Sequence, residues 1–149
     1  MNITQIRNAT QLITYAGKRF LVAPMLAPKG AYPGFPGTAH ADIRNPTVDL
    51  PVEVTTLLDA DAVIVTHTHD DHWDQTAIAQ IAKDKPIYVQ NDSDAALLRS
   101  QILLEAGNMP IERVAELVGF NSAVTWRQQF KARFGVSPAE WRRTFRTHS

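Results

Sequence analysis

Three histidines and two aspartates stand within six consecutive residues near the middle of the chain, in the order His-Thr-His-Asp-Asp-His. The possible metal ligands in this run are His67, His69, Asp71 and His72. Neutral imidazole and carboxylate groups suit zinc, and also iron or manganese. His67 and His69 could hold one ion while a second is bound by the other two side chains, or three of the four could share a single zinc. Two ions about 3.5–4 Å apart would position a water that attacks an ester, a lactone or a phosphoester.

A strand is expected directly before these ligands, because residues 61–66 include a continuous run of apolar β-forming side chains. Upstream, the alternation of apolar and polar residues predicts an antiparallel meander of three strands, at 3–7, 11–15 and 19–23. Downstream, Asp74 is expected to cap a helix over 74–83, and the next strand is expected at 86–90. These elements predict a sheet that presents the ligands at the end of one strand.

The connection between the third and fourth expected strands is rich in proline and glycine. Residues 24–51 contain six prolines and three glycines, which predicts a long irregular loop, and a short helix is expected over 52–58. An ordered loop of this length is often a lid or the wall of a site. The alternative is a surface loop that only wraps the sheet.

The last third of the chain has a helix-turn-helix pattern. A long helix is expected from Asp92 to Ala106, and apolar residues then recur at helical spacing over 111–118. Gly119 is expected to end the second of these helices, because glycine enters the left-handed region at little steric cost. Asn121 or Ser122 can cap the next helix, which has a stripe of aromatic residues four positions apart, namely Trp126, Phe130 and Phe134. Ser137, Pro138 and Glu140 have the pattern of a capped third helix.

The outer face of the helix after the turn is polar and basic, which is typical of a helix that enters the DNA major groove. Four positions on this face are expected to reach base edges, namely Ala123, Val124, Arg127 and Gln128. Three are better placed for phosphates, which hold position but carry little sequence information, namely Ser122, Lys131 and Arg142. The alternative is a small helical bundle with a solvated basic face.

Many residues between 103 and 142 bear on this interpretation. They are Leu103–Gly107, Ile111, Val114, Ala115, Gly119, Phe120, Phe130, Lys131, Gly135, Ser137, Pro138, Trp141 and Arg142. With these residues the segment resembles the second helix-turn-helix of the AraC family of bacterial transcription regulators, together with the end of that family's linker helix. The resemblance implies binding to double-stranded DNA through positions 123, 124, 127 and 128. Family members have two such motifs, and this sequence contains one.

The front of the chain resembles another family through the His-Thr-His-Asp-Asp-His run, residues 3–10 and residues 86–91. These resemble the first metal motif and the N-terminal half of the metallo-β-lactamase superfamily. The resemblance implies that the four possible ligands bind metal and that Asp71 also helps to position the nucleophilic water. The superfamily fold has a second half with further ligands, but after His72 the only histidine here is His148. This departure weighs against a working enzyme.

Composition and charge describe an ordinary globular chain with two different halves. The 149 residues include no cysteine, which excludes disulfides and thiolate metal sites and suits the cytoplasm. No apolar run approaches the roughly 20 residues of a membrane helix, and no signal peptide is expected. Residues 1–98 have a net charge of −4 and residues 99–149 a net charge of +4. The basic half is therefore the candidate for phosphate contacts.

The sequence as a whole predicts an α+β chain in two parts. Residues 1–98 are expected to form a partial metallo-β-lactamase-like αβ layer, and residues 99–149 an all-α AraC-like helix-turn-helix. The predicted function is sequence-specific DNA binding and transcription regulation, with a zinc-type hydrolase of a small lactone or ester as the alternative. A half-sandwich would leave a sheet face uncovered, so self-association is also expected.

Overall fold

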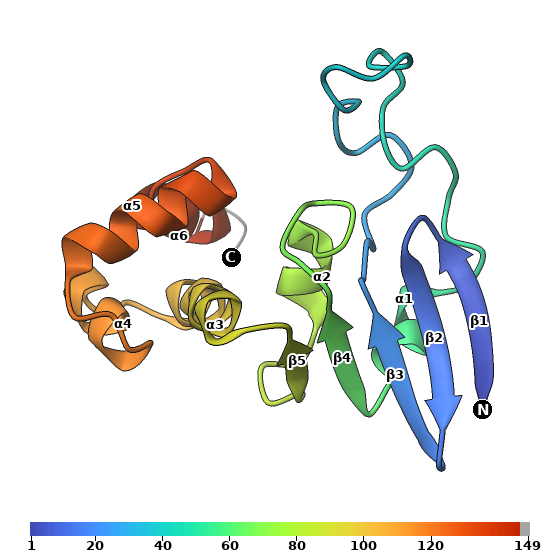
Figure 1. Ribbon diagram of the computed structural model, residues 1–149, viewed down its shortest axis with the longest axis horizontal. Helices are drawn as coiled ribbons and strands as arrows, with labels where there is room; N and C mark the ends of the chain where they lie inside the picture. The colour runs from blue at the N-terminus through green and yellow to red at the C-terminus, as the bar shows by residue number, and fades with distance from the viewer. Residues whose placement is uncertain (147–149) are drawn as a thin grey trace. The chain divides into compact units, whose positions relative to one another are not determined.

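The computed structural model describes residues 1–146, which form a five-stranded sheet followed by a set of helices (Figure 1). The chain divides into two compact units, the first covering Met1–Gln90 and the second beginning at Asn91. The first unit contains β1 (Asn2–Arg7), β2 (Thr10–Tyr15), β3 (Lys18–Val22), α1 (Val54–Leu58), β4 (Ala62–Val65), α2 (Gln75–Gln80) and β5 (Ile87–Val89). The second contains α3 (Asp92–Ala106), α4 (Ile111–Leu117), α5 (Ala123–Phe134) and α6 (Pro138–Arg146).

The five strands follow one another across the sheet in sequence order, and the direction of pairing changes at β3. β1, β2 and β3 form an antiparallel meander, whereas β4 and β5 pair in parallel with their neighbours. The meander and the continuous apolar strand at β4 confirm the sequence-based expectations. The parallel strands require crossover connections, which contain the long loop and α1 before β4 and the ligand run and α2 before β5.

One face of the sheet is covered and supplies the core of the first unit. Leu21 and Val63 are paired across β3 and β4, and both are almost fully buried. Leu57 of α1 and Ile78 of α2 are buried as well, as expected if both crossovers are right-handed and place their helices on the same face. The buried indole of Trp73 adds to the core next to the ligand run.

The other face of the sheet presents apolar side chains that remain partly exposed. By the strand register, these side chains are Ile3, Ile13 and Phe20 in one row, with Tyr15, Ile64 and Tyr88 on the same side. We call these six residues the open sheet face. Tyr15 is 60% and Tyr88 59% exposed. An apolar hollow of about 250 Å³ lies among Met1 and four of the six residues.

A buried arginine joins β1 to the loop at 24–51. Arg7 is only 3% exposed, and its guanidinium donates to the carbonyl oxygens of Met25 at 2.6 Å, Ala27 at 2.7 Å and Val48 at 3.0 Å. Burial lowers the pKa of Arg7 from its ordinary value, and nearby carboxylates partly offset that effect. Because the three carbonyls lie near both ends of the loop, this one side chain anchors both ends.

In the second unit, three helix ends have the caps that the sequence predicts. Gly119 follows α4 with φ of +91°, in the left-handed region. The Ser122 hydroxyl, rather than Asn121, accepts a bond from the N–H of Thr125 and so caps α5. At α6 the Ser137 N–H donates to the Glu140 carboxylate at 2.8 Å, and the Glu140 N–H donates to the Ser137 hydroxyl at 3.2 Å. These reciprocal bonds form a capping box.

The aromatic stripe of α5 forms most of the core of this unit. Trp126 and Phe130 have no exposed surface, and Trp141 of α6 is 4% exposed. The rings of Phe130 and Trp141 meet edge to face with centroids 5.8 Å apart. Phe134 lies at the edge of the cluster and is half-buried. The core therefore depends on α5, as the sequence predicts.

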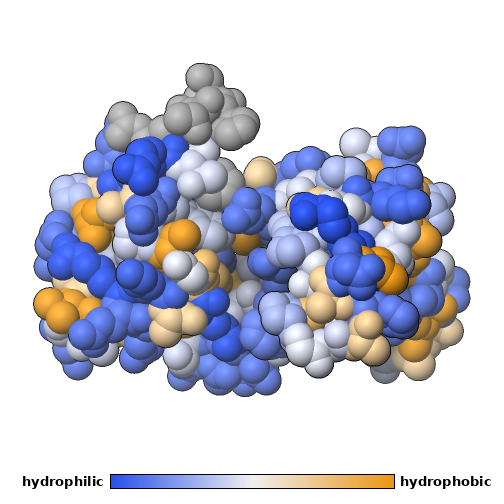
Figure 2. Space-filling view, turned by 90° about the horizontal axis from the view of Figure 1, so that it is seen from above, coloured by the Kyte–Doolittle hydropathy of each residue, from blue (hydrophilic) through white to orange (hydrophobic). Residues whose placement is uncertain are grey.

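The fold is α+β, with a sheet layer followed by an all-helical part, as the sequence predicts. The predicted boundary at 98/99 falls within α3, and it stays a prediction. None of the described helices is long and apolar enough to cross a membrane. The face of the molecule shown in Figure 2 is mostly hydrophilic, with separate hydrophobic patches between the polar side chains.

Candidate metal centre and nucleic-acid interface

The strand β4 presents the histidine-rich run at its carboxyl end. Three potential ligands converge there, and the donor atoms of His67, His69 and Asp71 all lie within 4.8 Å of one another. Donors of one tetrahedral zinc lie about 3.3–3.5 Å apart for zinc–ligand distances near 2.0–2.1 Å. Small side-chain rotations would therefore suffice for all three to bind one ion. Two imidazoles and a carboxylate also match the donor set of a catalytic zinc, which takes three protein ligands and keeps one open position.

The fourth predicted ligand, His72, lies beside this group. Its ring centroid is 3.8 Å from that of His67, and its Nε2 is 3.4 Å from Asp71 Oδ2. The hydroxyl of Thr66 lies 3.0 Å from Nδ1 of His72 and 3.3 Å from Nδ1 of His67. Thr66 therefore links the two Nδ1 atoms, an arrangement that would leave Nε2 of each ring to face a ligand.

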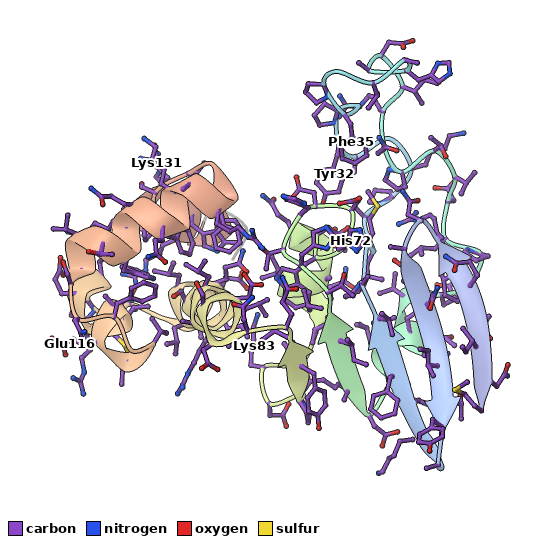
Figure 3. All side chains as sticks on the ribbon, in the orientation of Figure 1. Tyr32, Phe35, His72, Lys83, Glu116 and Lys131 are labelled. Carbon is purple, nitrogen blue, oxygen red and sulfur yellow. The ribbon has the colours of Figure 1, made fainter. Side chains whose placement is uncertain are left out.

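A pocket of about 440 Å³ opens beside the ligands and is lined by Phe35, His69, Asp70 and Asp71. Phe35 comes from the long loop and is 43% exposed. Figure 3 shows Tyr32 and Phe35 on this loop, at the same end of the sheet as His72. The loop therefore supplies one wall of the pocket. This favours the interpretation of the loop as the wall of a site over that of a surface loop that only wraps the sheet.

Backbone contacts give this loop a defined shape. Tyr32 and Asn45 exchange two backbone hydrogen bonds, at 2.7 and 2.9 Å. Arg44 donates to the carbonyl of Gly30 at 2.6 Å. At Gly34, a Cβ atom would lie only 2.3 Å from the carbonyl oxygen of Ala41, so a larger residue would force the two backbone segments apart.

Burial and neighbouring acids shift several proton affinities around the pocket. Burial, and then the nearby charge of Asp71, raises the pKa of Asp70. Burial, followed by Asp74 and Asp70, raises the pKa of Tyr32. Burial also raises the pKa of Asp74, although this carboxylate accepts bonds from the N–H groups of Ala77 and Ala27, each at 2.7 Å. Asp74 thus caps α2, as predicted, and fixes the start of the loop.

The predicted recognition face of α5 is exposed on the second unit. Val124 is 59% exposed, and Arg127, Gln128 and Lys131 are also exposed. Lys131 points away from the helix in Figure 3. Ala123 is half-buried at the start of the helix. The structure therefore brings these side chains onto one accessible helix face.

The two remaining predicted DNA contacts have different surroundings. Ser122 is exposed and acts as the cap of α5. Arg142 of α6 is half-buried, with its Nε and Nη2 atoms covered, whereas an exposed side chain was expected. Its phosphate contact stays a prediction.

Three residues near these sites were missed by the sequence reasoning. Thr66 directly precedes the ligand run, and a hydroxyl next to a histidine ligand could have suggested a supporting role. Phe35 lies far from the ligands in the sequence and could not have been placed. Glu112 of α4 forms an ion pair with Arg127 of α5, a contact between helices that no local sequence pattern indicates.

The helical region matches a known family. The model of the AraC family of bacterial regulatory helix-turn-helix proteins matches residues 104–143. This match supports DNA binding for the second unit, and it covers the end of α3, all of α4 and α5, and most of α6.

Part of the chain is similar to a curated protein and to two solved structures, one of a hydrolase and one of a possible hydrolase. The UPF0173 protein YddR of Bacillus subtilis is 53% identical over 96 residues, and this alignment covers 64% of the chain. The crystal structure of an isothiocyanate hydrolase from Delia radicum gut bacteria is similar with 58% identity and a TM-score of 0.65, over 67% of this chain. A possible metal-dependent hydrolase from Veillonella parvula gives 52% identity and a TM-score of 0.64, over 66% of this chain. This chain spans 38% of the length of each of these relatives.

Proposed function

We propose that the first unit binds a transition-metal ion through His67, His69 and Asp71, and that its function is hydrolysis of a small electrophile. The convergence of three donor atoms within 4.8 Å beside a pocket carries this proposal. Zinc fits the donor set best, with manganese or iron as alternatives. One shared ion fits the observed group better than two ions with separate ligand pairs.

The residues around the ion would have distinct roles. When bound, a divalent ion supplies Lewis acidity and a nucleophilic water at neutral pH. His67 and His69 would bind through imidazole nitrogens, and Asp71 through its carboxylate, which by family resemblance would also help to position the attacking water. His72 would support Asp71 or replace it as a ligand. Phe35 would exclude water from one side of the pocket.

The expected substrate is a small ester or lactone with an electrophilic carbon. An isothiocyanate also has an electrophilic carbon, and one similar solved protein is named as an isothiocyanate hydrolase. The match covers only 38% of the length of each relative, so the unmatched part of each relative would contribute further ligands and substrate contacts in that protein. Metal binding is therefore the step to test first.

The test is metal content and turnover of the purified chain. We expect about one zinc per chain after reconstitution, with loss of the metal in His69→Ala and Asp71→Ala. His40→Ala is the matched control, because His40 is exposed in the long loop and lies outside the ligand group. Turnover of an ester, a lactone and an isothiocyanate is then compared with and without metal. A wild-type chain that takes up no transition metal would contradict the proposal.

We also propose that the second unit binds double-stranded DNA in a sequence-specific manner and regulates transcription. The observation that favours this second function is the exposed face of α5 within a segment that matches the AraC family model. Arg127 and Gln128 would contact base edges, while Ala123 and Val124 would contact thymine methyl groups. DNA binding would place the protein in the cytoplasm, and the family resemblances would divide the chain at 98/99.

The test of DNA binding is selection from a random duplex pool at near-physiological salt. An enriched sequence is expected, and the spacing of its half-sites would distinguish a dimer from a single module. Arg127→Ala is expected to weaken binding to the selected duplex by roughly 1–3 kcal/mol and to relax specificity at one base pair. Arg143→Ala is the matched control, because it removes the same charge from an exposed position on α6 rather than from α5. Equal weakening of all duplexes by Arg127→Ala would exclude a base-reading role.

A further inference from the structure

An ion pair connects the two helices of the candidate DNA-binding unit on its solvent side. Nη2 of Arg127 on α5 pairs with Oε1 of Glu112 on α4. Glu112 lies in the first turn of α4. Its side chain is 63% exposed, and that of Arg127 is 43% exposed. The pair therefore places a carboxylate beside the arginine that is expected to read bases.

The pair is poorly suited to hold the fold together. Exposed ion pairs contribute about 0–1 kcal/mol to stability. The two helices also pack against each other, and each has buried side chains, namely Val114 and Ala115 on α4 and Trp126 on α5. The consequence of the pair should therefore appear in what Arg127 binds.

A nearby carboxylate changes how an arginine meets DNA. A free guanidinium on a flexible stem is attracted to any phosphate, and that attraction carries no sequence information. A guanidinium held by a carboxylate has a restricted direction and a locally balanced charge. It still has other N–H groups that can donate to the O6 and N7 atoms of guanine. The carboxylate itself repels the DNA backbone, which weakens binding wherever no base contact compensates.

We propose that Glu112 is a specificity-determining residue of the DNA-binding surface, acting by holding Arg127 and by opposing nonspecific phosphate contacts. This inference rests on the proposed DNA binding of the second unit. It assigns to α4 a role in discriminating between DNA sequences, whereas the base contacts themselves come from α5.

The chain provides a closely matched control. Glu116 also lies on α4, is also 63% exposed and is also paired with an arginine, Arg113, at 2.7 Å. Glu112→Gln and Glu116→Gln therefore remove the same charge from the same helix at equal exposure. Only the first of them removes the partner of Arg127.

The experiment measures the affinity of the full chain for the selected duplex and for a scrambled duplex, at several salt concentrations. Glu112→Gln is expected to bind the scrambled duplex more tightly and to lower the ratio of the two affinities roughly threefold to tenfold. Its binding should also depend more steeply on salt. Glu116→Gln is expected to leave the ratio unchanged. In an Arg127→Ala background, Glu112→Gln is expected to change the ratio less than it does in the wild-type chain, because only the direct repulsion between Glu112 and the phosphates is left to lose.

Two kinds of failure can be told apart. If the wild-type chain discriminates between the duplexes but Glu112→Gln keeps the wild-type ratio, or changes it as much as Glu116→Gln does, the inference is overturned while DNA reading stands. If the wild-type chain shows no discrimination at any salt concentration, the proposed DNA-reading function and this inference both fail.

Discussion

The indole N–H of Trp126 donates a 2.8 Å hydrogen bond to the hydroxyl of Ser100, which joins α5 to α3. Both residues are fully buried, and the Ser100 hydroxyl in turn donates to the carbonyl of Ala96 at 2.8 Å. A buried donor without a partner loses its hydration without compensation. This bond therefore links the orientation of the candidate recognition helix to the long helix that precedes it.

Ser100→Ala is expected to destabilise the helical unit by about 1–3 kcal/mol, because it leaves the buried indole N–H without its acceptor. Chemical denaturation followed by tryptophan fluorescence would measure the change. Ser93→Ala is the matched control, since Ser93 is exposed on the same helix. In a Trp126→Phe background the cost of Ser100→Ala should fall, because the donor is gone. An equal cost in both backgrounds would mean that the hydrogen bond is not responsible.

Thr66→Val is expected to lower metal affinity about 10- to 100-fold, because the hydroxyl that lies between His67 Nδ1 and His72 Nδ1 supports the orientation of both rings. Valine has a similar shape but cannot hydrogen-bond. The measurement is competition for zinc against a chelator of known affinity. Thr4→Val on the exposed edge strand β1 controls for the same chemical change away from the ligands. Unchanged affinity in Thr66→Val would show that the hydroxyl has no supporting role.

Local patterns in the sequence are sufficient to predict most elements of this fold. The meander follows from period-two alternation, α5 follows from Trp126 and Phe130 at helical spacing, and the capping box of α6 follows from Ser137 and Glu140. Each of these signals lies within a few residues of the structure it specifies. The closely spaced histidines and aspartates of residues 67–72 likewise predict a metal site without knowledge of the fold.

Contacts between distant segments could not be predicted in this way. Phe35 lines the pocket from a loop whose two ends are both bound by the buried Arg7, and nothing near Phe35 in the sequence indicates that. The partner of Arg127 is fifteen positions away on another helix. Helix α2 also ends earlier than predicted, at Gln80 rather than Lys83. The apolar periodicity of this segment does not mark where the helix stops.

Acid should weaken the start of α6 through Glu140. Hydrogen bonds from the Ser137 side chain, and then from its backbone N–H, lower the pKa of Glu140 below its ordinary value of 4.5. The stabilisation from this carboxylate is thus fully present above about pH 4.5 and is lost as the pH falls through the lower folded-state pKa. Thermal unfolding between pH 3 and pH 7 would show the loss.

The matched variant for this pH effect is Glu140→Gln, which keeps an amide oxygen to accept the Ser137 N–H but has no titrating group. Its acid-induced loss of stability should be smaller than that of the wild-type chain. Because Glu140 is fully exposed, the difference should also shrink at high salt. An identical pH dependence for both chains would assign the acid sensitivity to other carboxylates.

Self-association is expected through the open sheet face. Ile13 and Phe20 lie side by side in the sheet register, Tyr15 is 60% exposed, and no charged side chain lines the hollow among them. Pairing this face with the same face of a second copy would remove apolar surface from water on both, at a gain of about 25 cal/mol per Å² before association costs. Light scattering after size-exclusion chromatography, over a range of protein concentrations, would measure it.

A variant with a lysine on the open sheet face should be more monomeric than the wild-type chain, because the lysine charge would lose hydration in an apolar interface. Ile13→Lys places that charge beside Phe20. Thr4→Lys adds the same charge to an exposed position on the other side of the sheet and should leave association unchanged. If the wild-type chain is monomeric at every concentration, or if both variants dissociate it equally, the open sheet face does not mediate self-association.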